Sequence, residues 1–403
     1  TVGGSRDPIL RAIETYRPDF VVFVCSSGPQ SSRSQVEGTA GQDGLVALTK
    51  LPEKSWDIIE VQPDDPDQVF SKIEAKIEEL RNRHPTAKII VDYTGGTKSM
   101  SLGAGLAALT SGVEVSLVTG DRPDLKQVAP GTERAIRILF RRVEAHFALE
   151  RAEEAWKRYA YGEAAALLHE ADRNLTVTGE KTSVTRELRQ RIHRLKKASD
   201  LFEAWDRFDH SEALYIYRNP DHRLQNFPGM HVYGKALEIL CNEERQPLIL
   251  LDLWHNAQRC VHRRRFDDAL ARLYRLVEWT AQYILWREHK LETDQFPVTE
   301  IPDSTLRETL SRGADQQGNV KLGLFNALQV LRERSRDHPF ISALGRTLGG
   351  VDPWQQLQLW IERRNKSILA HGFDPIDQSA WQNAYDWMQR YWLPWLQKEL
   401  SDC

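Results

Sequence analysis

The first 140 residues alternate short apolar runs with longer amphipathic stretches. The apolar runs are rich in β-branched side chains, as in the buried strands of a parallel sheet, and the longer stretches have helical periodicity. Strands are expected at residues 19–25, 57–61, 87–93 and 113–118, and helices at 66–83 and 98–111. Residues 125–139 have the pattern of a hairpin around Pro130, Gly131 and Thr132. This alternation predicts an α/β fold with a doubly wound, parallel sheet over residues 1–140.

Beyond residue 140 the strand signal fades and the spacing of apolar residues becomes helical. The pattern Ala-Trp-x-Arg-aromatic, followed by Glu-Ala, begins at Ala155 and again at Ala204 with the same spacing. A looser echo runs from Phe266 through Ala269. Each copy is expected to be a helix, a short break and a second helix. Residues 218–227 are expected to be a loop.

The pattern therefore divides the chain into three expected regions. The α/β region over 1–140 is followed by a helical connector over 141–245 and an all-α C-terminal bundle over 246–403. The bundle should open with an amphipathic helix at 266–286 and close with a Trp-rich helix at 379–400.

A further helix is predicted from Pro353 to His371. Asp352 suits the N-cap, Pro353 the first helical position, and Gly372 can end the helix directly after His371. At about 100° per residue, Arg364 and His371 lie on one stripe of this helix. The apolar residues of the same stripe are Trp354, Leu357, Ile361 and Ile368.

An Arg and a His that face an apolar seam need a partner or a function. One interpretation is structural, with Arg364 in a salt bridge and His371 satisfied in the core. The other is RNA cleavage without a metal, in which His371 moves a proton, Arg364 holds the phosphate, and Asn365 orients either side chain. Because about 10 Å of helix separates Arg364 from His371, the spacing predicts a site that two copies of the chain complete around a two-fold axis.

Three loops of small polar residues are expected at one edge of the N-terminal sheet, where ligands of open α/β sheets bind. They contain Gly3, Gly4 and Ser5; Ser26, Ser27 and Gly28; and Thr94, Gly95, Gly96, Thr97 and Lys98. The third loop leads into a helix, whose N-terminus favours anions. It is not a P-loop, because Thr97 stands where that motif has its last Gly. A phosphate-rich ligand is expected, and tight turns without a ligand are the alternative; the lack of His, Asp or Glu within the loops favours binding over fast catalysis. A strand that precedes Thr1 is also expected.

Composition excludes some classes of function. The 403 residues carry a net charge of −3, so an RNA site has to be a local groove within a chain that has no general basic field. The four cysteines lack zinc-site spacing and are expected to be free thiols in a reducing cytoplasm. No run of about 18 apolar residues predicts a membrane span, and no signal peptide is visible.

Two segments of the chain resemble parts of one known family. The opening Thr-Val-Gly-Gly-Ser and the stretch Asp-Tyr-Thr-Gly-Gly-Thr-Lys-Ser-Met from Asp92 resemble the CARF domain (CRISPR-associated Rossmann fold). The stretch from Arg364 to His371, Arg-Asn-x5-His, resembles the signature of the HEPN ribonucleases. Together they make the chain similar throughout to the CARF–HEPN ancillary ribonucleases of type III CRISPR systems. The resemblance implies a Rossmann-like CARF domain at 1–140 and a HEPN domain at 246–403.

That resemblance also implies a mechanism. The CARF dimer binds cyclic oligoadenylate, an allosteric activator made by the type III effector complex, and the HEPN dimer then cuts single-stranded RNA. It implies ligand-binding roles for Gly4, Ser5, Ser26, Ser27, Thr94, Gly95, Gly96, Thr97 and Lys98, with Gly3 and Gly28 in the same loops. It implies catalysis by Arg364, Asn365 and His371. A homodimer in a prokaryotic cytoplasm is expected, with no metal, no other cofactor and no stable complex with the CRISPR effector.

Two other functions stay open. The chain could be a non-catalytic ligand sensor in which Arg364 and His371 are structural, or a ring nuclease that degrades the cyclic ligand in its own N-terminal pocket. A transcription regulator is disfavoured because the basic run Arg263, Arg264 and Arg265 is too short for a recognition helix. A metal nuclease is disfavoured because no acidic cluster lies in a fitting strand context.

Overall fold

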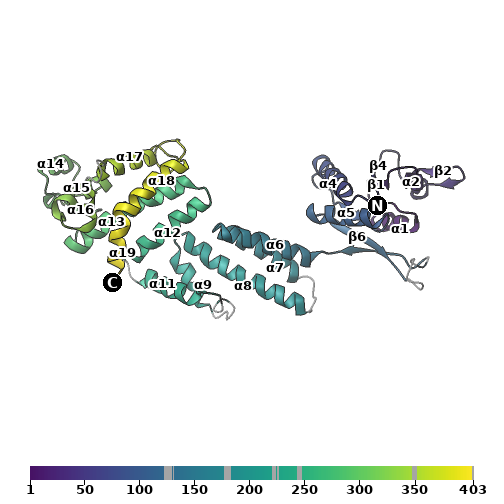
Figure 1. Cartoon of the computed structure of the whole chain (residues 1–403), viewed down its shortest axis with the longest axis horizontal. Coiled ribbons are helices and arrows are strands. Elements are labelled where there is room, and N and C mark those ends of the chain that lie inside the picture. The colour runs from purple at the N-terminus through teal and green to yellow at the C-terminus, as the bar shows by residue number, and fades with distance from the viewer. Residues whose placement is uncertain are drawn as a thin grey trace. The chain divides into compact units, whose positions relative to one another are not determined.

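The computed structural model describes residues 1–121, 129, 131–176, 183–219, 224, 227–242, 247–346 and 352–401. The chain forms two compact units, Thr1–Glu144 and Ala145–Cys403 (Figure 1). The first unit combines small β-sheets with helices, and the second is built mainly from helices. The predicted fold class is therefore confirmed.

The strands of the first unit form two small sheets. They are β1 (Val21–Ser26) paired in parallel with β4 (Trp56–Val61), and β5 (Ile90–Asp92) paired in parallel with β6 (Glu114–Thr119), to which β7 (Arg134–Ile138) is antiparallel. The helices are α1 (Asp7–Tyr16), α2 (Arg33–Glu37), α3 (Leu45–Thr49), α4 (Pro66–Arg83) and α5 (Lys98–Thr110), with a two-stranded ribbon of β2 (Gly38–Thr39) and β3 (Gln42–Asp43). Strand β7 is the second arm of the expected hairpin, but it pairs with β6, and residues 122–128 and Pro130 lie outside the described part of the chain.

Residues 1–3 lie between the two sheets. The Val2 amide donates to the carbonyl of Val24 in β1 at 2.8 Å, and the amino group of Thr1 donates to the carbonyl of Asp92 in β5 at 2.8 Å. The chain start therefore connects the carboxyl ends of β1 and β5. This places the first predicted ligand loop beside the third.

Helices cover both faces of the strand layer formed by the two sheets. Successive residues of a strand point to opposite faces, so neighbouring residues of β1 pack against different helices. Val24 of β1 packs into a core with α4 and α5, whereas its neighbours Phe23 and Cys25 pack into a second core with α1, α2 and α3. Two buried cores on opposite faces are the expected arrangement of a doubly wound sheet.

The second unit begins with paired helices and ends in a bundle. The paired helices are α6 (Arg141–Lys157), α7 (Tyr161–Thr176), α8 (Ser183–Asp206), α9 (His210–Arg218) and α11 (Met230–Asn242). The bundle contains α12 (Leu248–His262), α13 (Phe266–His289), α14 (Ser304–Ser311), α15 (Leu324–Arg334), α16 (Pro339–Leu344), α17 (Pro353–Asn365), α18 (Gln378–Trp387) and α19 (Leu393–Ser401), with a 3₁₀ turn η1 (Val298–Glu300) and a short ribbon of β8 (Phe296–Pro297) and β9 (Asn319–Val320). The predicted helix at 379–400 is interrupted by a π-helical segment, η2 (Met388–Trp392). Residues 220–223 and 225–226 of the expected loop lie outside the described residues.

One large hydrophobic core holds the bundle together. It extends from Leu250 on α12 to Leu396 on α19 and includes the buried rings of Trp392 and Phe340. The paired helices that precede it have two smaller cores of their own. Helix α13 crosses the large core, and it carries buried residues along most of its length.

The repeated sequence pattern forms three equivalent helix corners. Tyr159, Phe208 and Arg264 occupy the same position of the pattern, and each has a positive φ of 59°, 65° and 57° respectively. The next residue of each corner donates its amide to the carbonyl five positions earlier at 2.9 Å, which is a Schellman cap. The looser third echo therefore begins at Cys260 and forms the corner between α12 and α13.

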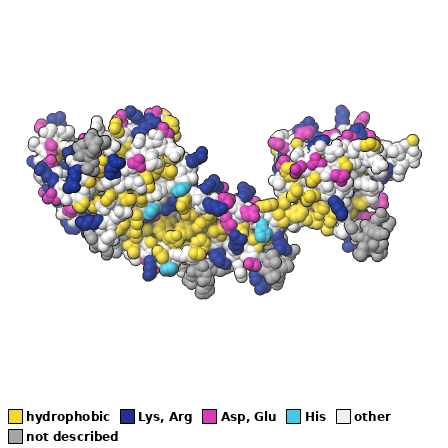
Figure 2. All heavy atoms as spheres, in the orientation of Figure 1, with side chains coloured by type: hydrophobic (Ala, Val, Ile, Leu, Met, Phe, Trp, Pro, Cys, Tyr) yellow, Lys and Arg dark blue, Asp and Glu magenta, His cyan; other side chains and the backbone are white. Residues whose placement is uncertain are grey.

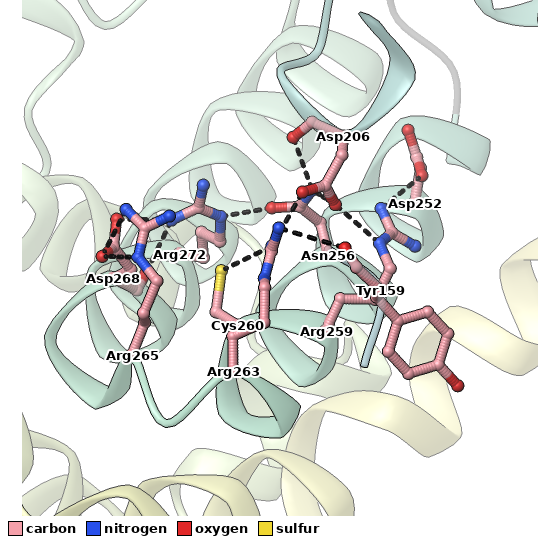
Figure 3. Close-up of polar contacts among 10 residues, drawn as sticks. All are labelled: Tyr159, Asp206, Asp252, Asn256, Arg259, Cys260, Arg263, Arg265, Asp268 and Arg272. Atoms are coloured by element: carbon pink, nitrogen blue, oxygen red, sulfur yellow. Dashed lines mark hydrogen bonds and ion pairs between the residues drawn. The ribbon is translucent and has the colours of Figure 1, made fainter. Parts of the chain in front are cut away.

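A buried polar network ties these three corners together (Figure 3). The Asp206 carboxylate accepts hydrogen bonds from Asn256 at 2.9 Å and Arg259 at 2.8 Å, and forms an ion pair with Arg263 at 2.7 Å. Arg263 also donates to the carbonyl of Tyr159 at 3.3 Å. Because Asp206, Tyr159 and Arg263 belong to different corners, their contacts fasten the paired helices to the start of the bundle.

Candidate functional site

Helix α17 ends at Asn365, so the predicted helix from Pro353 to His371 is wrong at its C-terminus. The Lys366 carbonyl accepts a hydrogen bond from the Asp374 amide at 2.9 Å. The Ser367 amide donates to the backbone carbonyl of Arg364 at 3.0 Å. These bonds turn the chain away from the helix axis. Gly372 allows the turn to close, because a Cβ there would lie 2.6 Å from the Lys366 carbonyl carbon.

This early end exposes residues that the helical pattern placed in the core. Leu357 and Ile361 are buried as predicted, and Trp354 packs against the core. Ile368, however, is 66% exposed, and His371 is exposed as well. The apolar spacing continues beyond Asn365 although the helix does not, so the prediction of one stripe through His371 fails.

The turn brings His371 back to the end of α17. The His371 amide donates to the carbonyl of Asn365 at 3.1 Å. The expected separation of about 10 Å assumed a helix that continues to His371. Because α17 ends at Asn365, this spacing gives no reason to expect a two-copy site. Asn365 contacts both predicted partners, because its side-chain oxygen also accepts from Arg364 Nη1 at 3.1 Å.

Arg364 is half-buried and lies on an aromatic ring. Its Cζ is 4.3 Å from the ring centroid of Tyr274, which comes from α13. Its Nε is buried and has no hydrogen-bond partner, and no carboxylate within ion-pair distance is found for it among the described residues. Among the described residues, Arg364 therefore forms no salt bridge, in contrast to the structural interpretation of this residue. Burial raises the pKa of Tyr274, the Glu278 carboxylate raises it further, and the Arg364 charge opposes them.

Several large apolar side chains in or near the turn are exposed. Leu359, Ile368, Leu369 and Phe373 are large apolar side chains with 63%, 66%, 45% and 89% of their surface exposed. Ser367, which directly precedes Ile368 in the sequence, is buried, and its hydroxyl has no hydrogen-bond partner among the described residues. Exposed apolar residues gathered in one short segment are typical of a surface that a partner covers.

The N-terminal loops meet at the carboxyl ends of the strands. A Cβ on Gly3 would lie 2.6 Å from the Gly96 nitrogen, and one on Gly95 would lie 2.6 Å from the Thr1 oxygen. The first and third loops therefore touch through their backbones, which only Gly permits. Gly96 also has a positive φ of 85°, a conformation that favours Gly.

Several hydroxyls predicted to bind a ligand are used by the fold. Thr94 Oγ1 accepts from the Val118 amide at 2.7 Å, and Thr97 Oγ1 caps α5 by accepting from the Met100 amide at 3.2 Å. Ser26 exchanges hydrogen bonds with Ser32 through its amide and hydroxyl. These three hydroxyls position the loops.

Other groups of the predicted ligand site remain accessible. Gly4, Ser5, Gly28, Gly96 and Lys98 are exposed, whereas the Ser27 hydroxyl is buried and is not among the accessible groups. The accessible part of the predicted site therefore consists of exposed loop backbone, the Ser5 hydroxyl and the Lys98 ammonium. Such groups favour an anionic ligand.

The family comparison matches the C-terminal part of the chain. Residues 240–393 match a family model described as the Csm6 HEPN domain. This part of the chain is therefore similar to the HEPN domain of Csm6 proteins. The match contains Tyr274, Arg364 and His371, so the turn and its aromatic support both lie within the matched region. It agrees with the HEPN part of the predicted CARF–HEPN family.

Two further comparisons concern the whole chain. Among solved structures, "Enterococcus italicus Csm6 bound to cyclic hexa-2'-fluoro-hexa-dAMP" is similar at 15% sequence identity and a TM-score of 0.46, with 100% of this chain and 94% of that chain covered. No curated protein gives a significant match.

Within the described ranges, no group of three or more His, Cys, Asp or Glu residues is placed to hold a metal ion. None of the helices described has both the length and the apolar character needed to cross a membrane. Cys25, Cys241 and Cys260 are free thiols, and Cys403 lies outside the described residues.

The sequence did not indicate Tyr274. It lies in a different helix from Arg364, and nothing in its local pattern separates it from other aromatic residues of α13. The end of α17 did have a local signal, because Asn365 and Ser367 are both weak helix formers that compete for backbone hydrogen bonds. The regular apolar spacing outweighed that signal in the prediction.

Proposed function

We propose that this protein is a homodimeric endoribonuclease that cleaves single-stranded RNA without a metal and is activated by cyclic oligoadenylate. The HEPN domain supplies the cleavage site and the N-terminal loops supply the activator site. The observation that carries the proposal is the state of Arg364, a half-buried cation that contacts a neutral amide and an aromatic ring. Such a cation is available for a phosphate.

The cleavage chemistry follows from the three side chains at the end of α17. His371 is exposed and can move the proton of the ribose 2′-hydroxyl or of the leaving oxygen. Arg364 can hold the phosphate and stabilise the charge that develops on it. Asn365 orients both, through its side chain and its carbonyl. Attack by the 2′-hydroxyl leaves a 2′,3′-cyclic phosphate and a 5′-hydroxyl.

Exposed apolar surfaces support the homodimer. One is the turn of the HEPN domain, where Phe373 is 89% exposed. Another belongs to the α/β unit, where Leu102 and Leu106 of α5 and Leu139 are exposed, and Figure 2 shows apolar side chains gathered over α5. Isologous pairing would cover each surface with its own copy.

The activator site is proposed at the loops that follow β1 and β5. Lys98 opens α5 and is exposed, so its ammonium and the helix N-terminus can both meet a phosphate. The hydroxyls of Thr94, Thr97 and Ser26 are engaged by backbone groups, which leaves few groups to activate a ribose 2′-hydroxyl of the ligand. We therefore expect ring cleavage, if it occurs, to be slow beside RNA cleavage.

The test is RNA cleavage by the full chain with and without each cyclic oligoadenylate, in buffer that contains a chelator. We expect one ring size to activate cleavage, Arg364→Ala and His371→Ala to remove it, and the chelator to change little. Activator loss should be followed by chromatography in the His371→Ala variant. If both variants cleave RNA at the activated wild-type rate, the site lies elsewhere and the proposal fails. Binding of the activator without any cleavage would instead identify a non-catalytic sensor.

A further inference from the structure

Four half-buried arginines of the helical unit pair with carboxylates. Arg259 and Arg263 both bond to the Asp206 carboxylate, at 2.8 Å and 2.7 Å, and Arg272 pairs with Asp268 at 3.3 Å. Arg334 likewise pairs with Glu300. Arg364 differs from these four, since it contacts the Asn365 amide oxygen and the Tyr274 ring.

This difference changes what the guanidinium can do. A carboxylate partner neutralises an Arg and occupies the N–H edge that would otherwise bind a phosphate. An aromatic face attracts the cation through the ring quadrupole and leaves the edge of the guanidinium plane open. Tyr274 therefore holds Arg364 without competing for its phosphate-binding donors.

The location of Tyr274 makes it a firm support. It lies on α13, and the residues beside it on that helix, Leu273, Leu276 and Val277, are fully buried in the large core. Tyr274 itself is half-buried, and the ring is the part that meets Arg364 at 4.3 Å. No hydrogen bond of its hydroxyl is found among the described residues. The ring face and not the hydroxyl is thus the group that acts on Arg364.

We propose that Tyr274 is a positioning residue of the HEPN site, whose ring orients the Arg364 guanidinium toward the scissile phosphate while keeping its charge available. The inference rests on the proposed ribonuclease function. It assigns Tyr274 no contact with the substrate and no proton transfer, and its effect passes through Arg364 alone.

The first test compares three substitutions in the full chain, with the activated rate measured at varied RNA concentration. Tyr274→Phe keeps the ring and should keep kcat. Tyr274→Leu removes the ring and should lower kcat by about 2- to 30-fold, the span of a cation–π contact from exposed to desolvated sites, with KM little changed. Trp279→Leu is the matched control, because Trp279 is another half-buried aromatic of α13 but stacks on Tyr283 and has no recorded contact with Arg364.

A second test keeps the shape of the side chain and changes only its electrostatics. Phe at position 274 with one, two or three ring fluorines has a progressively weaker quadrupole, so kcat should fall with each fluorine. This series remains informative even if Tyr274→Leu does not fold. In an Arg364→Ala background the same series should leave the residual rate unchanged, since the ring would have no cation to hold.

The outcomes separate the two proposals. Full activity of Arg364→Ala and His371→Ala would remove the ribonuclease site itself. Loss of activity in those variants, together with a kcat for Tyr274→Leu equal to that of Trp279→Leu and a flat fluorine series, would overturn only the role of Tyr274. A graded fall in kcat that disappears without Arg364 supports it.

Discussion

Replacing Gly372 with Ala should slow RNA cleavage by displacing His371. Gly372 lies against the backbone of Lys366, where a Cβ would overlap the carbonyl oxygen and lie 2.6 Å from the carbonyl carbon. Real Cβ contacts are essentially never shorter than 3.0 Å. The Lys366 carbonyl cannot simply rotate away, because it accepts the Asp374 amide at 2.9 Å. The turn itself would have to shift, by on the order of 1 Å.

The shift falls on the proposed acid–base group. His371 directly precedes Gly372, and its amide is held to the Asn365 carbonyl at 3.1 Å. A misplacement of about 1 Å in a reacting group costs about 10²-fold in rate. The added methyl group should cost about 1–3 kcal/mol of stability as overpacking, which a domain with a large core can tolerate. We therefore expect kcat to fall about 100-fold, while activator affinity stays the same because the N-terminal loops are unchanged.

The assay is activated RNA cleavage, with calorimetric activator binding and a thermal melt of the same preparation. Gly345→Ala is the control, since a Cβ there would meet nothing nearer than the Ser342 oxygen at 3.6 Å and the backbone is right-handed. It should leave the rate within about twofold. A folded Gly372→Ala protein that cleaves RNA as fast as wild type would show that the turn does not hold His371 in place.

Three further predictions address the other parts of the protein. Arg364→Ala and His371→Ala should each lower the cleavage rate by about 10²–10⁴ and leave activator binding intact. Mass spectrometry should find 2′,3′-cyclic phosphates on the wild-type products. Cleavage of DNA or 2′-blocked RNA at the same rate as RNA would contradict this mechanism. Lys98→Ala should weaken activator binding in calorimetry about tenfold or more, whereas Thr97→Ala should also lower the melting temperature because Thr97 caps α5; equal melting temperatures would argue against the cap. Asp206→Ala should cost about 3–5 kcal/mol in urea denaturation, because it leaves two half-buried arginines without their shared carboxylate, and a loss below about 1 kcal/mol would show that the network is not stabilising.

The periodicity of the sequence was sufficient to place most elements. The predicted helix at 66–83 corresponds to α4 (Pro66–Arg83), and the predicted strand at 57–61 lies within β4 (Trp56–Val61). Local signals such as the Pro at the start of α4 and the β-branched run of β1 reflect the same backbone physics in any context. The repeated Ala-Trp pattern likewise specifies its own corner, because the Schellman cap forms from residues close together in the chain.

Periodicity misplaced the one boundary that matters most for the site. The apolar spacing runs from Leu357 through Ile368, and it would continue the helix if apolar burial alone decided its length. The helix ends at Asn365 instead, where the Ser367 amide donates to the Arg364 carbonyl and the Asp374 amide donates to the Lys366 carbonyl. These bonds compete with helix propagation at energies too similar to be ranked from the pattern.

By itself, then, the sequence supplied the residues to which the proposed function assigns chemistry: an Arg, an Asn and a His close together near the C-terminus, and glycine loops with a Lys near the N-terminus. Only the tertiary structure decided how the cation is held. Tyr274 and Arg364 meet because α13 and α17 pack in one core, and a contact between distant segments has no local signal in the chain. The same holds for Gly3 and Gly96, whose close approach depends on the chain start lying between β1 and β5. Local propensities act over a few residues, whereas the relative placement of distant elements depends on the packing of the whole core.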